Sequence, residues 1–159
     1  MSKTEKQEIV HVASNRKALH DYHITDTYEA GLCLTGPEVK SLRERQVSME
    51  QSFARLNGGE AFILNLNIKP YRFDHVTTTL EPARTRKLLL KASELKKLIG
   101  RVAIKGNSLI PLEIYFKRGW AKVKLGLAEG KKAADKRDSI KKKDLEREVR
   151  REFKSSFRG

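Results

Sequence analysis

Residues 101–130 read RVAIKGNSLIPLEIYFKRGWAKVKLGLAEG and carry the pattern that decides the fold. Apolar and polar residues alternate on both sides of Arg118 and Gly119, which are suited to a turn. A period of two predicts two half-buried strands that form a hairpin. The apolar positions are Ile110, Leu112, Ile114 and Phe116 before the turn and Ala121, Val123, Leu125 and Leu127 after it. Pro111 lacks an N–H donor, so we expect its strand to lie at a sheet edge or to be bulged there.

Two further segments have strand patterns. Residues 22–34 (YHITDTYEAGLCL) place their apolar side chains on one parity, interrupted there only by Asp26, which predicts a long half-buried strand. Residues 52–68 (SFARLNGGEAFILNLNI) contain two apolar runs around Asn57, Gly58 and Gly59. These three residues tolerate the positive φ angles of a tight turn, so the segment predicts a second hairpin.

A first short helix is predicted within TGPEVKSLRER, residues 35–45. Thr35 and Glu38 have the spacing of a capping box, and Pro37 would occupy the first turn, where a missing N–H costs little. Val39 and Leu42 would then face the core.

A second short helix is predicted within ASELKKLIG, residues 92–100, with Leu95, Leu98 and Ile99 on one face. Ser93 would start it and Gly100 would end it in a left-handed conformation. About six strands with two or three short helices predict a mainly β domain over residues 1–130, an OB-like antiparallel β-barrel.

The charge balance points to a polyanionic partner. Lys and Arg number 34 against 20 Asp and Glu, a net charge of +14, and the pI is about 10.0. No stretch approaches the roughly 20 apolar residues of a membrane span, so nucleic acid is favoured over a membrane. The N-terminus has no apolar signal core, and a single cysteine, Cys33, agrees with a reducing compartment; both indicate a cytoplasmic protein.

Residues 131–159 form a basic C-terminal tail of different composition. They contain 12 Lys or Arg against 6 Asp or Glu, a net +6. The larger apolar residues lie mostly four apart, which gives a narrow helical stripe that is too thin to dock firmly on a barrel. We therefore expect the tail to be disordered alone and helical when it is bound in a groove of RNA. The alternative is a solvated charged tail without a specific role.

Catalytic and metal sites are weakly indicated. His20 and His23 lead into a strand, where positions three apart point to opposite faces, so no metal site is expected. Asp26, Glu29 and Glu38 are the candidates for an acidic nuclease site, but no phosphate-binding glycine loop accompanies them. We expect a non-enzymatic protein without a cofactor.

A basic segment precedes the second helix. EPARTRKLLLKASELKK, residues 81–97, contains Arg84, Arg86, Lys87 and Lys91. As a loop beside a barrel it would contact an RNA backbone, although charge runs are also common on solvated surfaces. A general single-strand RNA binder or ribosomal structural protein would use the same features.

Three blocks carry a specific resemblance. NRKALHDYHITDTYEAGLCLTGPEVKSLR (15–43), PARTRKLLLKASEL (82–95) and KVKLGLAEGKKAADKR (122–137) resemble the signature blocks of the SsrA-binding protein family, or small protein B. Members of that family are described as OB-type barrels that bind the tRNA-like domain of transfer-messenger RNA (tmRNA) and deliver it to stalled ribosomes. Their C-terminal tail is understood to enter the empty decoding centre and mRNA channel as a helix.

The resemblance implies partners and site residues. Its RNA-binding positions match Asn15, Glu29 and Leu89, to which charge and placement add Lys17, Arg86, Lys87 and Lys124. The tail motif that would lie in the ribosomal decoding centre falls on Gly130, Lys131, Lys132, Asp135, Lys136 and Arg137. Ala134 stands where the family usually has an aromatic residue or His, so stacking on a base is not expected there. Elongation factor Tu would join through the aminoacylated tmRNA, and peptide-bond chemistry would belong to the ribosome.

Overall fold

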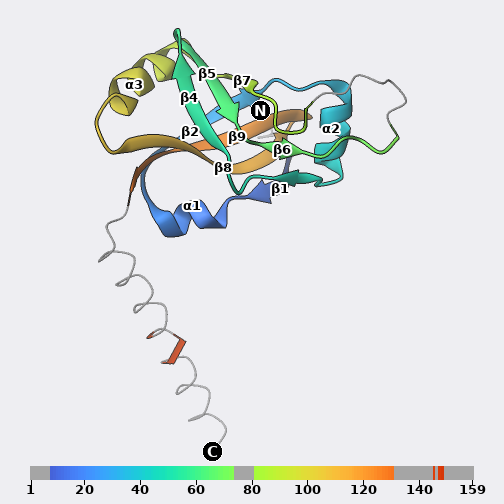
Figure 1. Ribbon diagram of the computed structural model, residues 1–159, viewed down its shortest axis with the longest axis horizontal. Coiled ribbons are helices and arrows are strands. Elements are labelled where there is room, and N and C mark those ends of the chain that lie inside the picture. Colours follow the sequence, from blue (N-terminus) through green and yellow to red (C-terminus); the bar gives the residue numbers. More distant parts are fainter. Residues whose placement is uncertain (1–7, 74–80, 131–144, 146, 149–159) are drawn as a thin grey trace, which may run out of the picture.

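The protein is an antiparallel β-barrel with short helices at its periphery (Figure 1). The structure, a computed structural model, describes residues 8–73, 81–130, 145, 147 and 148. The strands are β1 (Ile9–Ser14), β2 (Tyr22–Leu32), β3 (Val47–Ser48), β4 (Phe53–Asn57), β5 (Glu60–Leu64), β6 (Asn67–Ile68), β7 (Arg86–Leu89), β8 (Asn107–Lys117) and β9 (Trp120–Gly130). The helices are α1 (Arg16–Asp21), α2 (Gly36–Arg43) and α3 (Ala92–Val102).

Six strands close the barrel in the order β8-β4-β5-β7-β2-β9, and β9 pairs back with β8. Strand β1 adds to β8 outside the ring, and β3 pairs with β6 in a separate ladder. The main core fills the interior and includes the fully buried Ile63, Ile114, Val123 and Leu125. The mainly β, OB-like barrel predicted from the sequence is therefore confirmed.

Both predicted hairpins are present. Strands β4 and β5 join through Gly58 and Gly59, which have φ angles of 60° and 77°. Strands β8 and β9 join through Arg118 and Gly119, with φ angles of 51° and 80°. Two successive positive φ angles are what a two-residue turn requires to match the twist of the flanking strands.

Pro111 lies at a bulge and not at an edge. The register between β8 and β9 shifts between Pro111 and Glu113, while β8 also pairs with β1 and β4. The edge alternative is therefore wrong and the bulge alternative is confirmed. An extra residue reverses the face of every later side chain. The expected single apolar face is accordingly split, because Leu112 packs in a small second cluster and Ile114 packs in the main core.

Strand β2 has the predicted parity, with Ala30 and Leu32 buried and Glu29 exposed. The polar interruption at Asp26 coincides with a register shift against β9 between Ile24 and Asp26. The bulge moves Ile24 to the second apolar cluster, which lies outside the main core.

Helix α2 forms as expected. The backbone N–H of Thr35 donates to Oε1 of Glu38 over 3.0 Å, which is the carboxylate half of the capping box. Pro37 lies in the first turn, Leu42 is fully buried and Val39 packs against the core.

Helix α3 differs from its prediction at both ends. It begins after Lys91 and continues through Gly100 to Val102, so Ser93 does not start it and Gly100 does not end it. Leu98 is buried, and Leu95 and Val102 pack against the core. Burial along this stripe outweighs the cost of about 1 kcal/mol for a glycine inside a helix. Ile99 lies off the stripe and is 46 % exposed.

Helix α1 and strand β1 were not predicted, because each has only six residues and little periodicity. Strand β9 ends at Gly130, where the proposed tail begins. The predicted behaviour of residues 131–159 concerns a segment that lies almost entirely outside the described residues. Among the residues described, no helix is both long and apolar enough to cross a membrane.

Candidate nucleic-acid interface

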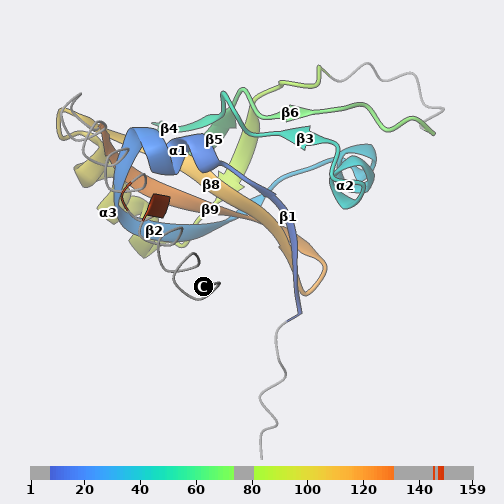
Figure 2. The same cartoon turned by 90° about the horizontal axis from the view of Figure 1, so that it is seen from below.

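The outer surface of five neighbouring strands forms one continuous wall. Strand register places a row of residues across it: Leu89 lies opposite Gly31, Gly31 opposite Lys122, Lys122 opposite Tyr115 and Tyr115 opposite His11. Figure 2 shows β2, β9, β8 and β1 side by side on this surface. We call it the strand wall, defined by His11, Glu29, Leu89, Glu113, Tyr115, Lys117, Lys122 and Lys124.

A second row carries alternating charge. Lys124 on β9 lies opposite Glu29 on β2 and opposite Glu113 on β8. Residues directly opposite on the same face interact across neighbouring strands. The wall is therefore a mosaic of cations, carboxylates and aromatic rings, not a uniform basic patch.

Glu29 is held by two neighbours. The Tyr115 hydroxyl donates to its Oε2 over 2.5 Å, and the Lys117 ammonium lies 3.3 Å from its Oε1. The hydrogen bond from Tyr115 lowers the pKa of Glu29 below its ordinary value, with Lys117 assisting and burial opposing. Burial, followed by the bond to Glu29, raises the pKa of Tyr115. At neutral pH the wall thus presents an ionised carboxylate that retains free acceptor positions.

The wall is hollowed. One hollow of about 340 Å³ is lined by residues that include His11, Glu29, Tyr115 and Lys124. A neighbouring hollow of about 440 Å³ shares Lys124 and extends to Asn15 at the start of α1. The concave surface therefore runs along the strands as far as the first helix.

Four sequence-predicted residues are on or beside this surface; Glu29, Leu89 and Lys17 are exposed, and Lys124 is partly buried. Glu29 and Lys124 lie at its centre, and Leu89, which is 55 % exposed, lies on β7 next to Gly31. Lys17 is exposed on α1 and lines a further hollow beside that helix.

Lys87 lies on the same outward face of β7 as Leu89 and is exposed. Its ammonium pairs with the Glu60 carboxylate at 3.0 Å, and both side chains are about half exposed. Such a pair is held weakly, so the ammonium can exchange that partner for a phosphate.

Asn15 is buried, whereas a residue that contacts RNA directly would be exposed. It is 6 % exposed, its Nδ2 donates to the Pro111 carbonyl over 3.1 Å, and its Oδ1 accepts from the Ala18 N–H over 3.2 Å. It caps α1 and ties that helix to the bulge of β8. Its effect on a bound ligand would therefore act through the position of α1.

Arg86 is not available to RNA, so its assignment as a contact is wrong. Its side chain is 1 % exposed, its Nε donates to Glu38 over 2.6 Å, and its Nη1 donates to the Leu66 carbonyl over 2.6 Å. The segment is strand β7 and not a loop. Alternation along that strand turns Arg86 inward and Lys87 outward.

The three carboxylates that were candidates for a nuclease site do not form a cluster, because each binds a different partner. Asp26 pairs with Arg101, Glu29 is bound by Tyr115, and Glu38 binds both Arg84 and Arg86. Within the residues that the structure describes, no group of three or more His, Cys, Asp or Glu could hold a metal ion.

Sequence reasoning missed His11, Tyr115 and Lys117. The signal for the last two was present, because they occupy the polar parity of β8 between the apolar residues. His11 lies on the unpredicted strand β1, so nothing local indicated it. Gly130 ends β9, and the other tail positions of the expected decoding-centre motif lie outside the described part of the chain.

The fold and the hollowed wall define a small barrel protein of the OB-like class. A family model described as SmpB protein matches residues 12–155. The chain therefore belongs to the SmpB family.

Individual relatives match over nearly the whole chain. An SsrA-binding protein of Elusimicrobium minutum is 51 % identical over 158 residues, which is 99 % of each chain. An SsrA-binding protein of Bacillus subtilis is 47 % identical over 152 residues, which cover 93 % of this chain and 94 % of that protein. A solved structure described as "tmRNA-SmpB: a journey to the center of the bacterial ribosome" is similar with a TM-score of 0.64 and 54 % identity. The match covers 77 % of this chain and 85 % of that one.

Proposed function

We propose that this chain is a non-enzymatic RNA-binding factor of trans-translation. Its strand wall binds the tRNA-like domain of tmRNA, and it delivers this RNA to stalled ribosomes. Residues 131–159 enter the empty decoding centre and mRNA channel, and elongation factor Tu joins through the aminoacylated tmRNA. The support is the similarity to SsrA-binding proteins along nearly the whole chain and to the SmpB of a tmRNA-SmpB structure.

One observation carries the assignment of the RNA-binding surface. Glu29 and Leu89, which the family resemblance marks for RNA binding, lie on the same wall although 60 positions separate them in the chain. Gly31 lies between them and has no side chain, so β7 can approach β2 closely. A Cβ added at Gly31 would lie only 3.3 Å from the Leu89 Cβ. The wall can thus offer an acceptor and an apolar contact to one ligand.

The lysines and the carboxylate of the wall have different roles in RNA binding. Lys117, Lys122 and Lys124 supply charge that neutralises phosphates, which gives salt-sensitive attraction without sequence preference. The ionised Glu29 accepts hydrogen bonds from 2′-hydroxyl groups or exocyclic amines, and these donors depend on the shape of the RNA.

The first test compares binding of the full chain to a tRNA-like domain and to unstructured RNA of equal length across a salt series. We expect both affinities to fall with salt and the folded RNA to keep its advantage. Lys124→Gln should reduce the log–log slope by about 0.7 to 0.9. Lys97→Gln, on an exposed position of α3, is the matched control. An advantage that vanishes at high salt would favour a general single-strand RNA binder instead.

Two variants separate the wall from the tail. Glu29→Ala should weaken binding of the folded RNA while the barrel stays folded, because Glu29 is exposed. A chain that ends at Gly130 should keep most of its RNA affinity and lose tagging of stalled peptides. Simultaneous loss of both activities in the shortened chain would contradict this division of labour.

A further inference from the structure

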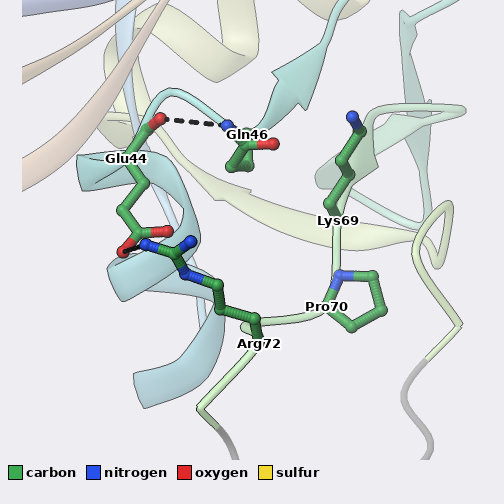
Figure 3. Close-up of a pocket in the computed structure, with 5 residues that line it drawn as sticks. All are labelled: Glu44, Gln46, Lys69, Pro70 and Arg72. Carbon is green, nitrogen blue, oxygen red and sulfur yellow. Dashed lines mark hydrogen bonds and ion pairs between the residues drawn. The ribbon is translucent and has the colours of Figure 1, made fainter.

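A second polar surface lies where α2 ends and the segment after β6 begins. The Lys69 N–H donates to the Gln46 carbonyl over 3.0 Å, next to the pairing of β3 with β6, so the two segments are joined. Figure 3 shows the hollow between them. It has a volume of about 510 Å³ and is lined by Glu44, Gln46, Lys69, Pro70 and Arg72.

Beside this hollow, two aromatic rings contact each other and each ring has a cation over it. The Lys40 ammonium lies 5.4 Å from the centre of the Tyr71 ring. The Tyr71 and Phe73 rings pack edge to face at 5.6 Å, and the Arg72 guanidinium lies 4.7 Å from the Phe73 ring. We call these four residues, with Lys69, the α2 corner.

The side chains of the α2 corner contact one another and are nevertheless open to solvent. Phe73 is 56 % exposed, and the Arg72 side chain is 72 % exposed. The Glu44 carboxylate lies 3.9 Å from the Arg72 guanidinium, at the limit of an ion pair. A guanidinium beside an open aromatic ring is the chemistry that binds unpaired nucleobases by stacking, and adjacent ammonium groups bind phosphates.

The α2 corner continues the strand wall at one end. Strand β2 begins at Tyr22, opposite Gly130, and ends at Leu32, about 33 Å away at about 3.3 Å per residue, just before α2. The Arg43 guanidinium of α2 lies 4.7 Å from the ring of Phe116, a core residue that precedes Lys117 at the same end of β8. The end of the wall opposite Gly130 is therefore the end nearest α2, and an RNA that extends past this end can reach the α2 corner.

We propose that the α2 corner binds an unpaired nucleotide of the RNA that lies on the strand wall. The base stacks on Phe73 and Arg72, and the Lys69 ammonium contacts its phosphate. The charge favours RNA over a protein partner, because among the described residues of this corner Lys40, Lys69 and Arg72 outnumber the acid Glu44. The cations remain in the majority when Asp74, the next residue after Phe73 in the sequence, is counted as well. The identity of the RNA as the tRNA-like domain rests on the function proposed above.

The test places 2-aminopurine at single unpaired positions of the tRNA-like RNA and adds the full chain. We expect one position to lose fluorescence on binding, as stacking requires, and Phe73→Leu to restore it. The same variant should weaken binding roughly five- to hundredfold with an unchanged salt slope. Lys69→Gln should instead reduce the slope by about 0.7. Phe73→Tyr, which keeps the ring, is the control, and thermal unfolding checks that every variant is folded.

The possible failures are distinguishable. If the unaltered chain shows no preference for the folded RNA, the proposed function and this inference both fail. If that preference is present but Phe73→Leu changes neither affinity nor the fluorescence of any position, only the α2 corner is refuted. Normal RNA binding by the corner variants with impaired ribosome engagement would overturn it equally, because the surface would then face the ribosome.

Discussion

Replacing Glu38 by alanine should destabilise the barrel more than any surface charge change. The Glu38 side chain is 8 % exposed, and it binds Arg84, Arg86 and the Thr35 N–H. Without it, the guanidinium of Arg86, which is 1 % exposed, would lose the carboxylate that pairs with it among the described residues. Removing one partner of a buried ion pair costs about 3 to 5 kcal/mol, and loss of a helix cap about 1 kcal/mol, with overlap between the two.

We therefore expect the free energy of unfolding to fall by about 4 kcal/mol and the melting temperature by roughly 8 to 16 °C. Urea unfolding at pH 7, followed by far-UV circular dichroism, measures the difference. Glu60→Ala is the matched control, because its pair with Lys87 is about half exposed and should contribute under about 1 kcal/mol. Losses for the two variants that agree within about 1 kcal/mol would refute the reasoning.

The same carboxylate gives the stability a pH dependence. Burial alone would raise the pKa of Glu38, but hydrogen bonds from Arg84, Thr35 and Arg86 hold it below its ordinary value. Because the pKa of Glu38 is lower in the folded chain, its ionised carboxylate adds to the free energy of unfolding. This contribution is complete above the pKa of an unfolded Glu, about 4.3, and is lost as the pH falls through the pKa of Glu38 in the folded chain. The stability difference between the unaltered chain and Glu38→Gln should therefore shrink in acid.

Three further predictions concern the strand wall, the second apolar cluster and helix α3. Tyr115→Phe should raise the pKa of Glu29 toward its ordinary value, because the hydrogen bond from Tyr115 is the largest cause of its lowering. NMR titration of the Glu29 carboxyl measures this pKa; an unchanged pKa would mean that Lys117 alone keeps it low. Gly126→Ala should cost about 1 to 3 kcal/mol in thermal unfolding, because the added Cβ would lie 2.9 Å from Leu112 Cδ1. Gly100→Ala has no atom within 4 Å of the added Cβ and lies inside α3, so it should stabilise by up to about 1 kcal/mol; a loss would contradict the assigned helix.

Local chemistry explains which elements were predictable. The β4–β5 and β8–β9 hairpins depend on turn residues next to alternating strands, and the start of α2 depends on Thr35, Pro37 and Glu38 within one turn. Each signal acts over a few residues, so no distant contact was needed to interpret it. Similarly, strand parity alone placed Glu29 on the outer surface.

Distant packing explains the errors. Helix α3 continues through Gly100 because Val102 finds a place against the core. The apolar residues of β8 divide between two clusters because the bulge after Pro111 reverses their direction. Local sequence predicts Arg86 to be a surface cation, because its partner Glu38 lies 48 positions earlier in the chain.

The sequence by itself therefore determined the barrel class, the two hairpins, the basic character and the family resemblance, since these depend on local periodicity, turn chemistry and composition. Only the tertiary structure decided which charges are exposed, that Glu29 is bound by Tyr115, and that Leu89 and His11 share a wall with it. The physical reason is that burial and strand register depend on contacts between residues far apart in the chain. A charged side chain lies inside only where a distant partner compensates its desolvation.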